Sequence, residues 1–249
     1  MKKPLLLSLA TLLLTGAIHA EKVPPVDPNA LAILKHMSDT LAGAKAFTVR
    51  SNALLEVPSA TGQFLTLRSL GKIALRRPDK MSAMLGGDAP AFEFFYDGGS
   101  VSAVAPKAKV YSTTNAPATI DEMLAGVRRQ TGINLHFSPL LLSDPSAHLT
   151  RNLQSAVVVG QTRVNGVLCD HLAFRAQGVN WEIWVSTGRT ALPYRFAATF
   201  TDRANFPRKF IEFSRWNLHP WLFGDSFTFH PPSGFKEIPF STVLRDAGR

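Results

Sequence analysis

Cysteine is almost absent from this chain: one residue, Cys169, occurs among 249. A single thiol cannot form an internal disulfide, a Cys-rich zinc site, a CxxC redox centre or an iron–sulfur cluster. Familiar catalytic motifs are also absent, since the sequence contains no G-x-S-x-G, H-E-x-x-H, P-loop or G-x-G-x-x-G pattern. Charged residues make up only 18%, whereas hydrophobic residues make up 45%, which excludes an intrinsically disordered chain.

A long apolar run occurs only near the N-terminus. Lys2 and Lys3 precede an apolar segment of about 14 residues, Leu5 to Ile18, which is shorter than the roughly 20 residues that span a bilayer. We therefore expect a cleaved signal peptide over residues 1–20 and a linker over 21–26, with an uncleaved anchor as the alternative. Because no cysteine follows the run, we expect a soluble periplasmic protein with no stable membrane span, not a lipoprotein.

Basic residues exceed acidic ones, 27 to 18. They occur as short, widely separated pairs such as Arg76-Arg77 and Arg208-Lys209, whereas a nucleic-acid surface concentrates them in one stripe. We expect no nucleic-acid partner. A solvated basic surface is the simplest interpretation, and attraction to anionic lipid head groups is the alternative.

The hydrophobic pattern predicts a helix, then strands, then a short helical insertion, then an antiparallel meander. The first helix begins at Pro28 after Asp27 and ends near Gly43. A capping-box sequence at Thr119 opens a second helix that stops at Gly132, and the insertion extends to residue 142. Alternating residues predict strands over 47–57, 65–76, 92–96, 101–105, 156–164, 167–176, 181–185, 194–201 and 209–218.

Two turn sequences predict hairpins with two-residue connections, Asp97-Gly98 and Asn165-Gly166. Short turns between consecutive strands imply antiparallel pairing, so the fold class is α+β. Trp181 and Trp184 lie three residues apart and face opposite sides of their strand. Since both sides carry apolar bulk, the sheet needs cover on both faces or must curl around a cavity. We expect one domain over 27–240 and a C-terminal tail over 241–249.

The most tempting catalytic cluster is Cys169-Asp170-His171. In a strand, Cys169 and His171 share a face and Asp170 lies on the other, so the sequence favours a buried cysteine and a hydrogen-bonded structural histidine. The carboxylate pairs Glu93 with Asp97 and Glu182 with Asp170 are interpreted as solvated strand residues. The histidines show no metal-ligand spacing, so we expect no metal and no cofactor.

Five sequence blocks carry a family resemblance. They are residues 76–80 (RRPDK), 96–98 (YDG), 164–171 (VNGVLCDH), 180–184 (NWEIW) and 192–193 (LP). In order and spacing they resemble an uncharacterised bacterial family of predicted periplasmic proteins, a domain of unknown function related to the lipoprotein carriers LolA and LolB and to the sensor RseB. The resemblance implies a LolA-like unclosed antiparallel β half-barrel, with a helical lid over an apolar cavity that takes acyl chains.

The sequence and the resemblance together predict a non-enzymatic periplasmic protein that binds a lipid or an acylated polypeptide, such as an envelope lipoprotein, as carrier or sensor. The insertion over 119–142 supplies the lid. We expect the following residues to line the cavity: Leu67, Ile73, Leu75, Met123, Val127, Trp181, Phe196 and Trp216. A protein-interaction module of the cell envelope without a lipid ligand is the first alternative, and an unrecognised hydrolase is the second.

Overall fold

The computed structural model describes residues 26–131, 135, 137–240 and 242–243. Its helices are α1 (Pro28–Gly43), α2 (Ile120–Thr131) and α3 (Pro145–Leu149), with the 3-10 turns η1 (Pro106–Ala108), η2 (Ser138–Leu141) and η3 (Gly224–Phe227). Its strands are β1 (Ala46–Pro58), β2 (Phe64–Arg76), β3 (Lys80–Gly87), β4 (Phe92–Tyr96), β5 (Ser100–Ala105), β6 (Val110–Asn115), β7 (Leu153–Val164), β8 (Val167–Ala176), β9 (Val179–Ser186), β10 (Pro193–Phe200), β11 (Arg208–Asn217) and β12 (Lys236–Glu237). The predicted signal peptide lies outside the described residues.

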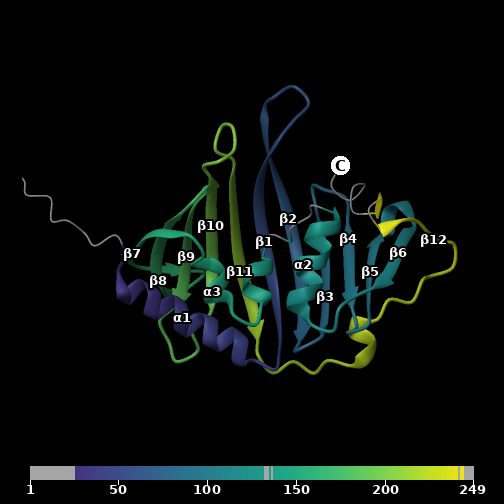
Figure 1. The fold of residues 1–249 in the computed structure, drawn as a ribbon, viewed down its shortest axis with the longest axis horizontal. Coiled ribbons are helices and arrows are strands. Elements are labelled where there is room, and N and C mark those ends of the chain that lie inside the picture. Colours follow the sequence, from purple (N-terminus) through teal and green to yellow (C-terminus); the bar gives the residue numbers. More distant parts are fainter. Residues whose placement is uncertain (1–25, 132–134, 136, 241, 244–249) are drawn as a thin grey trace, which may run out of the picture.

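The strands form one sheet in the order β12-β6-β5-β4-β3-β2-β1-β11-β10-β9-β8-β7. Pairing is antiparallel throughout except between β12 and β6, which run parallel. The two ends of the sheet, β7 and β12, do not pair with each other, so the sheet is unclosed (Figure 1). The predicted α+β half-barrel is confirmed, with one parallel strand added at its edge.

The helices lie on one face of the sheet, which we call the inner face (Figure 1). Helix α1 begins where predicted. The Asp27 side chain accepts a hydrogen bond from the Asn29 N–H, and Pro28 has no backbone N–H that would need an acceptor. Helix α2 begins with the predicted capping box: the Thr119 hydroxyl accepts from the Glu122 N–H at 3.2 Å and donates to the Glu122 carboxylate at 3.1 Å. Both helices turn their apolar stripes to the sheet.

The main core fills the space between these helices and the inner face. Alternate strand residues point into it, as the two-residue period predicts. Its fully buried members come from segments far apart in the chain, including Leu34 of α1, Phe47 of β1, Phe94 of β4 and Phe213 of β11. These segments therefore share one core, and the domain limits of 27 and 240 stay a prediction.

The predicted hairpin β7–β8 forms with Asn165 and Gly166 both at positive φ, 49° and 83°, as its tight turn requires. The hairpin β4–β5 also forms, but the prediction of a two-residue connection was wrong. Three residues, 97–99, separate the strands. The Asp97 carboxylate accepts hydrogen bonds from the N–H groups of Gly99 and Ser100 and from the Ser100 hydroxyl, which stabilises the longer turn.

Strands β3 and β6 were not predicted. Strand β3 consists largely of Met, Ala, Gly and Ser, which have no strong strand preference. It becomes a strand because β2 and β4 flank it and pair with it on both sides. Tertiary pairing therefore overrides a weak local signal.

The outer face of the sheet has a cover that the sequence did not reveal. After β11 the chain passes along one end of the sheet and returns beside β6 as β12 (Figure 1). On the way Phe227 becomes fully buried beneath the Arg76 guanidinium, 5.2 Å from the ring centroid, and Phe229 packs against Phe95 and Tyr111. This segment thus covers the outer face locally, at Arg76 of β2, Phe95 of β4 and Tyr111 of β6, whereas Leu70 and Met84 on the same face stay exposed.

Candidate ligand-binding face

Strand pairing arranges the inner-face residues in rows that cross six strands, from β8 through β9, β10, β11 and β1 to β2. We name each row by one aromatic member. The Trp181 row consists of the successive partners Phe174, Trp181, Ala198, Lys209, Leu55 and Leu67. The adjacent Phe196 row consists of Leu172, Ile183, Phe196, Ile211, Ala53 and Ser69.

Aromatic stacking links the two rows at β8 to β10. The rings of Phe174 and Trp181 are stacked, with centroids 3.9 Å apart and planes 9° apart. The rings of Trp181 and Phe196 follow, with centroids 5.9 Å apart. Such contacts add to the free energy gained by burying the rings themselves. The result is a firm apolar platform on this part of the inner face.

Solvent exposure changes along the Trp181 row. Phe174, Trp181 and Ala198 are only 3%, 4% and 3% exposed, respectively. Lys209, Leu55 and Leu67 are half-buried. The apolar row therefore begins under the cover of the core and continues into a part of the sheet that solvent reaches.

Most of the eight predicted cavity residues share one environment. Six belong to the buried inner core: Ile73, Leu75, Met123, Val127, Trp181 and Phe196. Trp216 is half-buried at the margin of this core, where it contacts Phe47 and donates from Nε1 to the Pro193 carbonyl at 2.9 Å. Leu67 lies at the outer end of the Trp181 row, apart from the buried core. Contact of any of the eight with a ligand stays a prediction.

Lys209 is an inner-face residue that the sequence analysis missed. Its ammonium lies over the rings of Phe196 and Phe200, at 5.2 and 5.6 Å from the ring centroids. Burial, and secondarily the positive charge of Arg203, lower the pKa of Lys209 from 10.5 to about 8. The available signal was strand alternation, because Lys209 has the same parity as Ile211 and Phe213 in β11.

The outer face of β8 to β11 carries a separate cluster around Trp184, 8% exposed, and Cys169, fully buried. Trp184 stacks on His171 with centroids 4.1 Å apart, and the Arg195 guanidinium lies 5.3 Å from the Trp184 ring centroid. The two tryptophans of β9 therefore do face opposite sides, as predicted. The sheet is apolar on both sides here.

The contacts of Cys169 and His171 are those of structural residues. His171 Nε2 makes a 2.8 Å hydrogen bond with Glu182, and the Cys169 thiol lies 3.5 Å from the Val167 carbonyl, to which it donates. Burial raises the pKa of the Cys169 thiol, which disfavours the reactive thiolate. The prediction of a buried cysteine and a hydrogen-bonded histidine is confirmed. Glu182 differs from the expected solvated strand carboxylate because it pairs with His171.

A pocket of about 340 Å³ with both charged and apolar lining residues lies between α2, η2 and α3. Its lining residues are Asp121, Leu124, Ala125, Arg128, Ser138, Leu142, Ser143, Asp144, Ala147, His148 and Arg151. Burial and the nearby charges of Arg151 and Arg128 lower the pKa of His148. None of the predicted cavity residues lines this pocket, and its mixed charges make it unlike an acyl-chain site.

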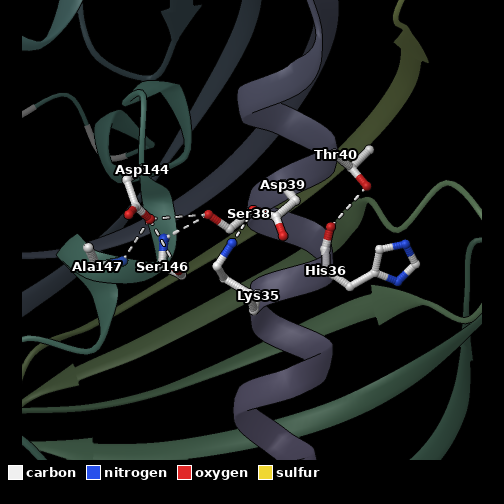
Figure 2. Close-up of polar contacts among 8 residues, drawn as sticks. All are labelled: Lys35, His36, Ser38, Asp39, Thr40, Asp144, Ser146 and Ala147. Carbon is white, nitrogen blue, oxygen red and sulfur yellow. Dashed lines mark hydrogen bonds and ion pairs between the residues drawn. The ribbon is translucent and has the colours of Figure 1, made fainter.

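Helix α3 is held beside this pocket by contacts with α1 (Figure 2). The Ser38 hydroxyl accepts a hydrogen bond from the Ser146 N–H at 3.0 Å and donates to the Asp144 carboxylate at 3.5 Å. The same carboxylate accepts from the Ala147 N–H and so caps α3. These contacts attach the helical insertion to the first helix.

Two further properties bear on function. Among the residues that the structure describes, no group of three or more His, Cys, Asp or Glu side chains is placed to hold a metal ion. In the same part of the chain, no helix combines the length and the apolar character needed to cross a membrane.

Comparison with solved structures finds proteins of similar fold. A crystal structure of an uncharacterized conserved protein from Thermus thermophilus has a TM-score of 0.50 at 10% identity, over 84% of this chain and 98% of the other. The lipoprotein LppX from Mycobacterium tuberculosis has a TM-score of 0.47 at 14% identity, over 77% and 96%. A LolA superfamily protein from Nitrosomonas europaea has a TM-score of 0.38 at 11% identity, over 80% and 97%.

At such low identities these likenesses concern the fold alone. A comparison with curated proteins gives no significant match. The family described as "Predicted periplasmic protein (DUF2092)" matches residues 30–241, almost the entire described chain. The resemblance inferred from the sequence blocks is thereby confirmed, and the chain belongs to this family of predicted periplasmic proteins.

Proposed function

We propose that this protein is a periplasmic carrier or sensor that holds a lipid, or the acyl chain of a lipoprotein, against the inner face of its half-barrel and catalyses no reaction. The observation that carries this proposal is the Trp181 row. Its apolar surface extends from the buried Trp181 to the half-buried Leu55 and Leu67. An acyl chain can therefore begin its contact at the accessible end and continue toward the stacked aromatic rings.

The driving force is the transfer of apolar surface from water. Each methylene that becomes buried contributes about 0.8 kcal/mol. Trp181 and Phe196 of the sheet and Met123 of α2 belong to one buried core and are already less than 9% exposed, so a ligand that reaches them must replace contacts within this core. We expect α2 to move away from the inner face on binding, as a lid does.

The first test is native mass spectrometry of the protein purified from periplasm, before and after extraction with organic solvent. A reproducible additional mass of lipid size that disappears on extraction would support the proposal and identify the ligand class. Because a bound lipid can be lost during purification, the extracted protein is then titrated with a fluorescent fatty acid. A bare chain that also fails to take up the fatty acid would refute lipid binding.

A protein-interaction module of the envelope is the second candidate, and one observation favours it. Trp221 and Phe223 are 85% and 67% exposed in the segment between β11 and η3, with ring centroids 6.2 Å apart. Neighbouring aromatic rings are unusual on a free surface and common in docking sites. The negative outcome of the lipid test would make this candidate the leading one.

A further inference from the structure

The pocket between α2, η2 and α3 has the size and the composition of a site for a small molecule. Its volume of about 340 Å³ lies at the lower end of the range for ligand pockets, and such pockets combine an apolar lining with a few charged groups. The apolar part of this lining is made by Leu124, Ala125, Leu142 and Ala147. No lining residue belongs to the Trp181 row or the Phe196 row, so the pocket is separate from the inner face.

The cations of the pocket come from two segments of the chain and lie close together. Arg128 belongs to the last turn of α2, His148 lies in α3, and Arg151 follows shortly after α3. Partial burial, and then the positive charges of Arg151 and Arg128, lower the pKa of His148. Both guanidinium groups therefore act on the same imidazole. An anion placed among them would be attracted by two full positive charges.

Asp121, one of the two carboxylates of the pocket, is engaged by the pocket wall. It accepts hydrogen bonds from the Ser143 N–H at 3.0 Å and from the Ser143 hydroxyl at 2.6 Å. It also lies near Arg77, which does not line the pocket, and its charge opposes the burial that lowers the pKa of Arg77. Asp121 thus has a cation on its other side, and its negative charge does not act on the pocket alone.

Asp144, the second carboxylate, is engaged in a similar way. It accepts hydrogen bonds from the Ala147 N–H at 3.0 Å and from the Ser146 hydroxyl at 2.9 Å (Figure 2). The positive charge of Lys35 on α1, outside the pocket, also helps to lower the pKa of Asp144. The oxygens of this carboxylate are therefore used to hold α3 in place.

The arginines of the pocket differ from its carboxylates. Among the residues that the structure describes, no ion pair joins Arg128 or Arg151 to a carboxylate. Both residues are exposed, so a ligand can reach them from solvent. A guanidinium presents a planar set of N–H donors that matches a carboxylate or a phosphate. The pocket therefore fits an anion better than a cation.

We propose that this pocket binds a small organic anion, a short apolar body that carries one carboxylate or phosphate group. Arg128 and Arg151 bind the charged group from two segments, and Leu124 and Leu142 contact the apolar body. The ligand thereby joins α2 to the turn that follows α3. This site goes beyond the proposed function, because it shares no residue with the inner-face rows.

The test measures the dissociation constants of benzoate, phenyl phosphate and the neutral benzyl alcohol by ligand-observed NMR titration at pH 7. Ionic strength is kept constant, because salt screens exposed charges. At least one anion is predicted to bind roughly tenfold more tightly than the alcohol, equivalent to about 1.4 kcal/mol. The tighter anion identifies the charged group. Arg128→Met and Arg151→Met should each weaken binding of this anion about tenfold and change that of the alcohol less than about twofold.

Arg129→Met is the matched control, because it removes the same charge from the next position of α2, which is exposed and does not line the pocket. It should keep both affinities. Ala147→Trp fills the pocket without changing its charge and keeps the backbone N–H that Asp144 accepts. This variant should bind none of the three compounds, and circular dichroism checks that each variant is folded. Arg128→Gln replaces Arg128→Met if the latter does not fold.

Three results would overturn the site. They are equal affinities for anions and alcohol in the native protein, unchanged anion affinity in both arginine variants, and an equal loss in Arg129→Met. Failure of both anions to bind at millimolar concentration would overturn it as well. That failure would leave the proposed function standing, because lipid binding concerns the inner face and is tested by its own titration.

Discussion

Trp181 and Trp184 lie on the same strand, β9, and on opposite faces of the sheet, with almost equal exposure, 4% and 8%. Trp181 stacks on Phe174 within the inner core, whereas Trp184 stacks on His171 in the outer cluster. Replacing either tryptophan should cost stability, but only Trp181 belongs to the proposed binding surface. Comparing the two substitutions therefore distinguishes a loss of stability from a loss of the binding surface.

We predict that Trp181→Leu weakens binding of dodecanoate at least tenfold, while Trp184→Leu changes it less than twofold. Each substitution removes a large buried ring and should lower the free energy of unfolding by about 2–3 kcal/mol. Binding by fluorescence titration and stability by urea denaturation check both statements on the same samples. Equal losses of binding in the two variants would show that the inner face has no special role.

Lys209→Met is predicted to raise the free energy of unfolding at pH 7, because a partly buried charge is replaced by an apolar side chain of similar length. The pKa of Lys209 is about 8 in the folded protein and 10.5 when unperturbed. Between these values the unfolded chain binds the proton more readily, so the native protein gains stability relative to the variant as pH rises.

The advantage of Lys209→Met should consequently be constant below about pH 8 and shrink between pH 8 and 10.5. Urea denaturation of both proteins at pH 7, 8.5 and 10 measures the difference, in which titrations common to both proteins cancel. A difference that does not change over this range would mean that the Lys209 ammonium is as well hydrated in the fold as in the unfolded chain.

The successes of the sequence analysis concern local signals. The first residues of α1 and α2 follow from Asp27 and Thr119, whose side chains satisfy backbone N–H groups at the helix start. Alternation likewise places Trp181 and Phe196 on the inner face. These patterns act within a few residues, so they can be read without knowing which strands become neighbours.

The failures concern relations between distant segments. Strand β3 depends on pairing with β2 and β4, and the cover of the outer face by Phe227 depends on a chain segment more than 100 residues away from β5. The sequence analysis grouped Lys209 with Arg208 as a basic pair on the solvated surface, because both residues are charged. The alternation of β11, which places Lys209 on the same face as Ile211 and Phe213, was not used. The sequence pattern could not show that Leu67 is more exposed than Trp181. Both residues alternate in the same way, and they differ only in how far other parts of the fold cover their strands.

The Asp144 carboxylate provides a test of how the helical insertion is attached. Hydrogen bonds from the Ala147 N–H and the Ser146 hydroxyl hold the pKa of Asp144 below its usual value. Asp144→Ala is predicted to lower the free energy of unfolding by about 1 kcal/mol at pH 7, the ordinary effect of losing a helix cap. Asp39→Ala, at an exposed carboxylate on α1, should change it by less than about 0.5 kcal/mol.

A depressed carboxylate pKa stabilises the fold above the unfolded pKa of about 3.9, and this contribution is lost as pH falls through the lower folded value. The gap between the native protein and Asp144→Ala should therefore narrow in acid. Thermal denaturation at pH 7, 5 and 3 measures it. A gap of constant size would show that the cap acts equally well when protonated and would contradict the assigned hydrogen bonds.

The tryptophans also offer a direct view of ligand entry. Trp221 is 85% exposed, whereas Trp181 and Trp184 are less than 9% exposed. We predict that Trp221→Phe removes most of the emission that acrylamide quenches and leaves the protein as stable as before. In this variant, titration with dodecanoate should still change the remaining emission, because Trp181 contributes to it. The change should become much smaller in the double variant Trp221→Phe/Trp181→Leu, which keeps Trp216 at the margin of the inner core, and it should persist in Trp221→Phe/Trp184→Leu. A signal that follows Trp184 instead would place the ligand on the outer face of the sheet.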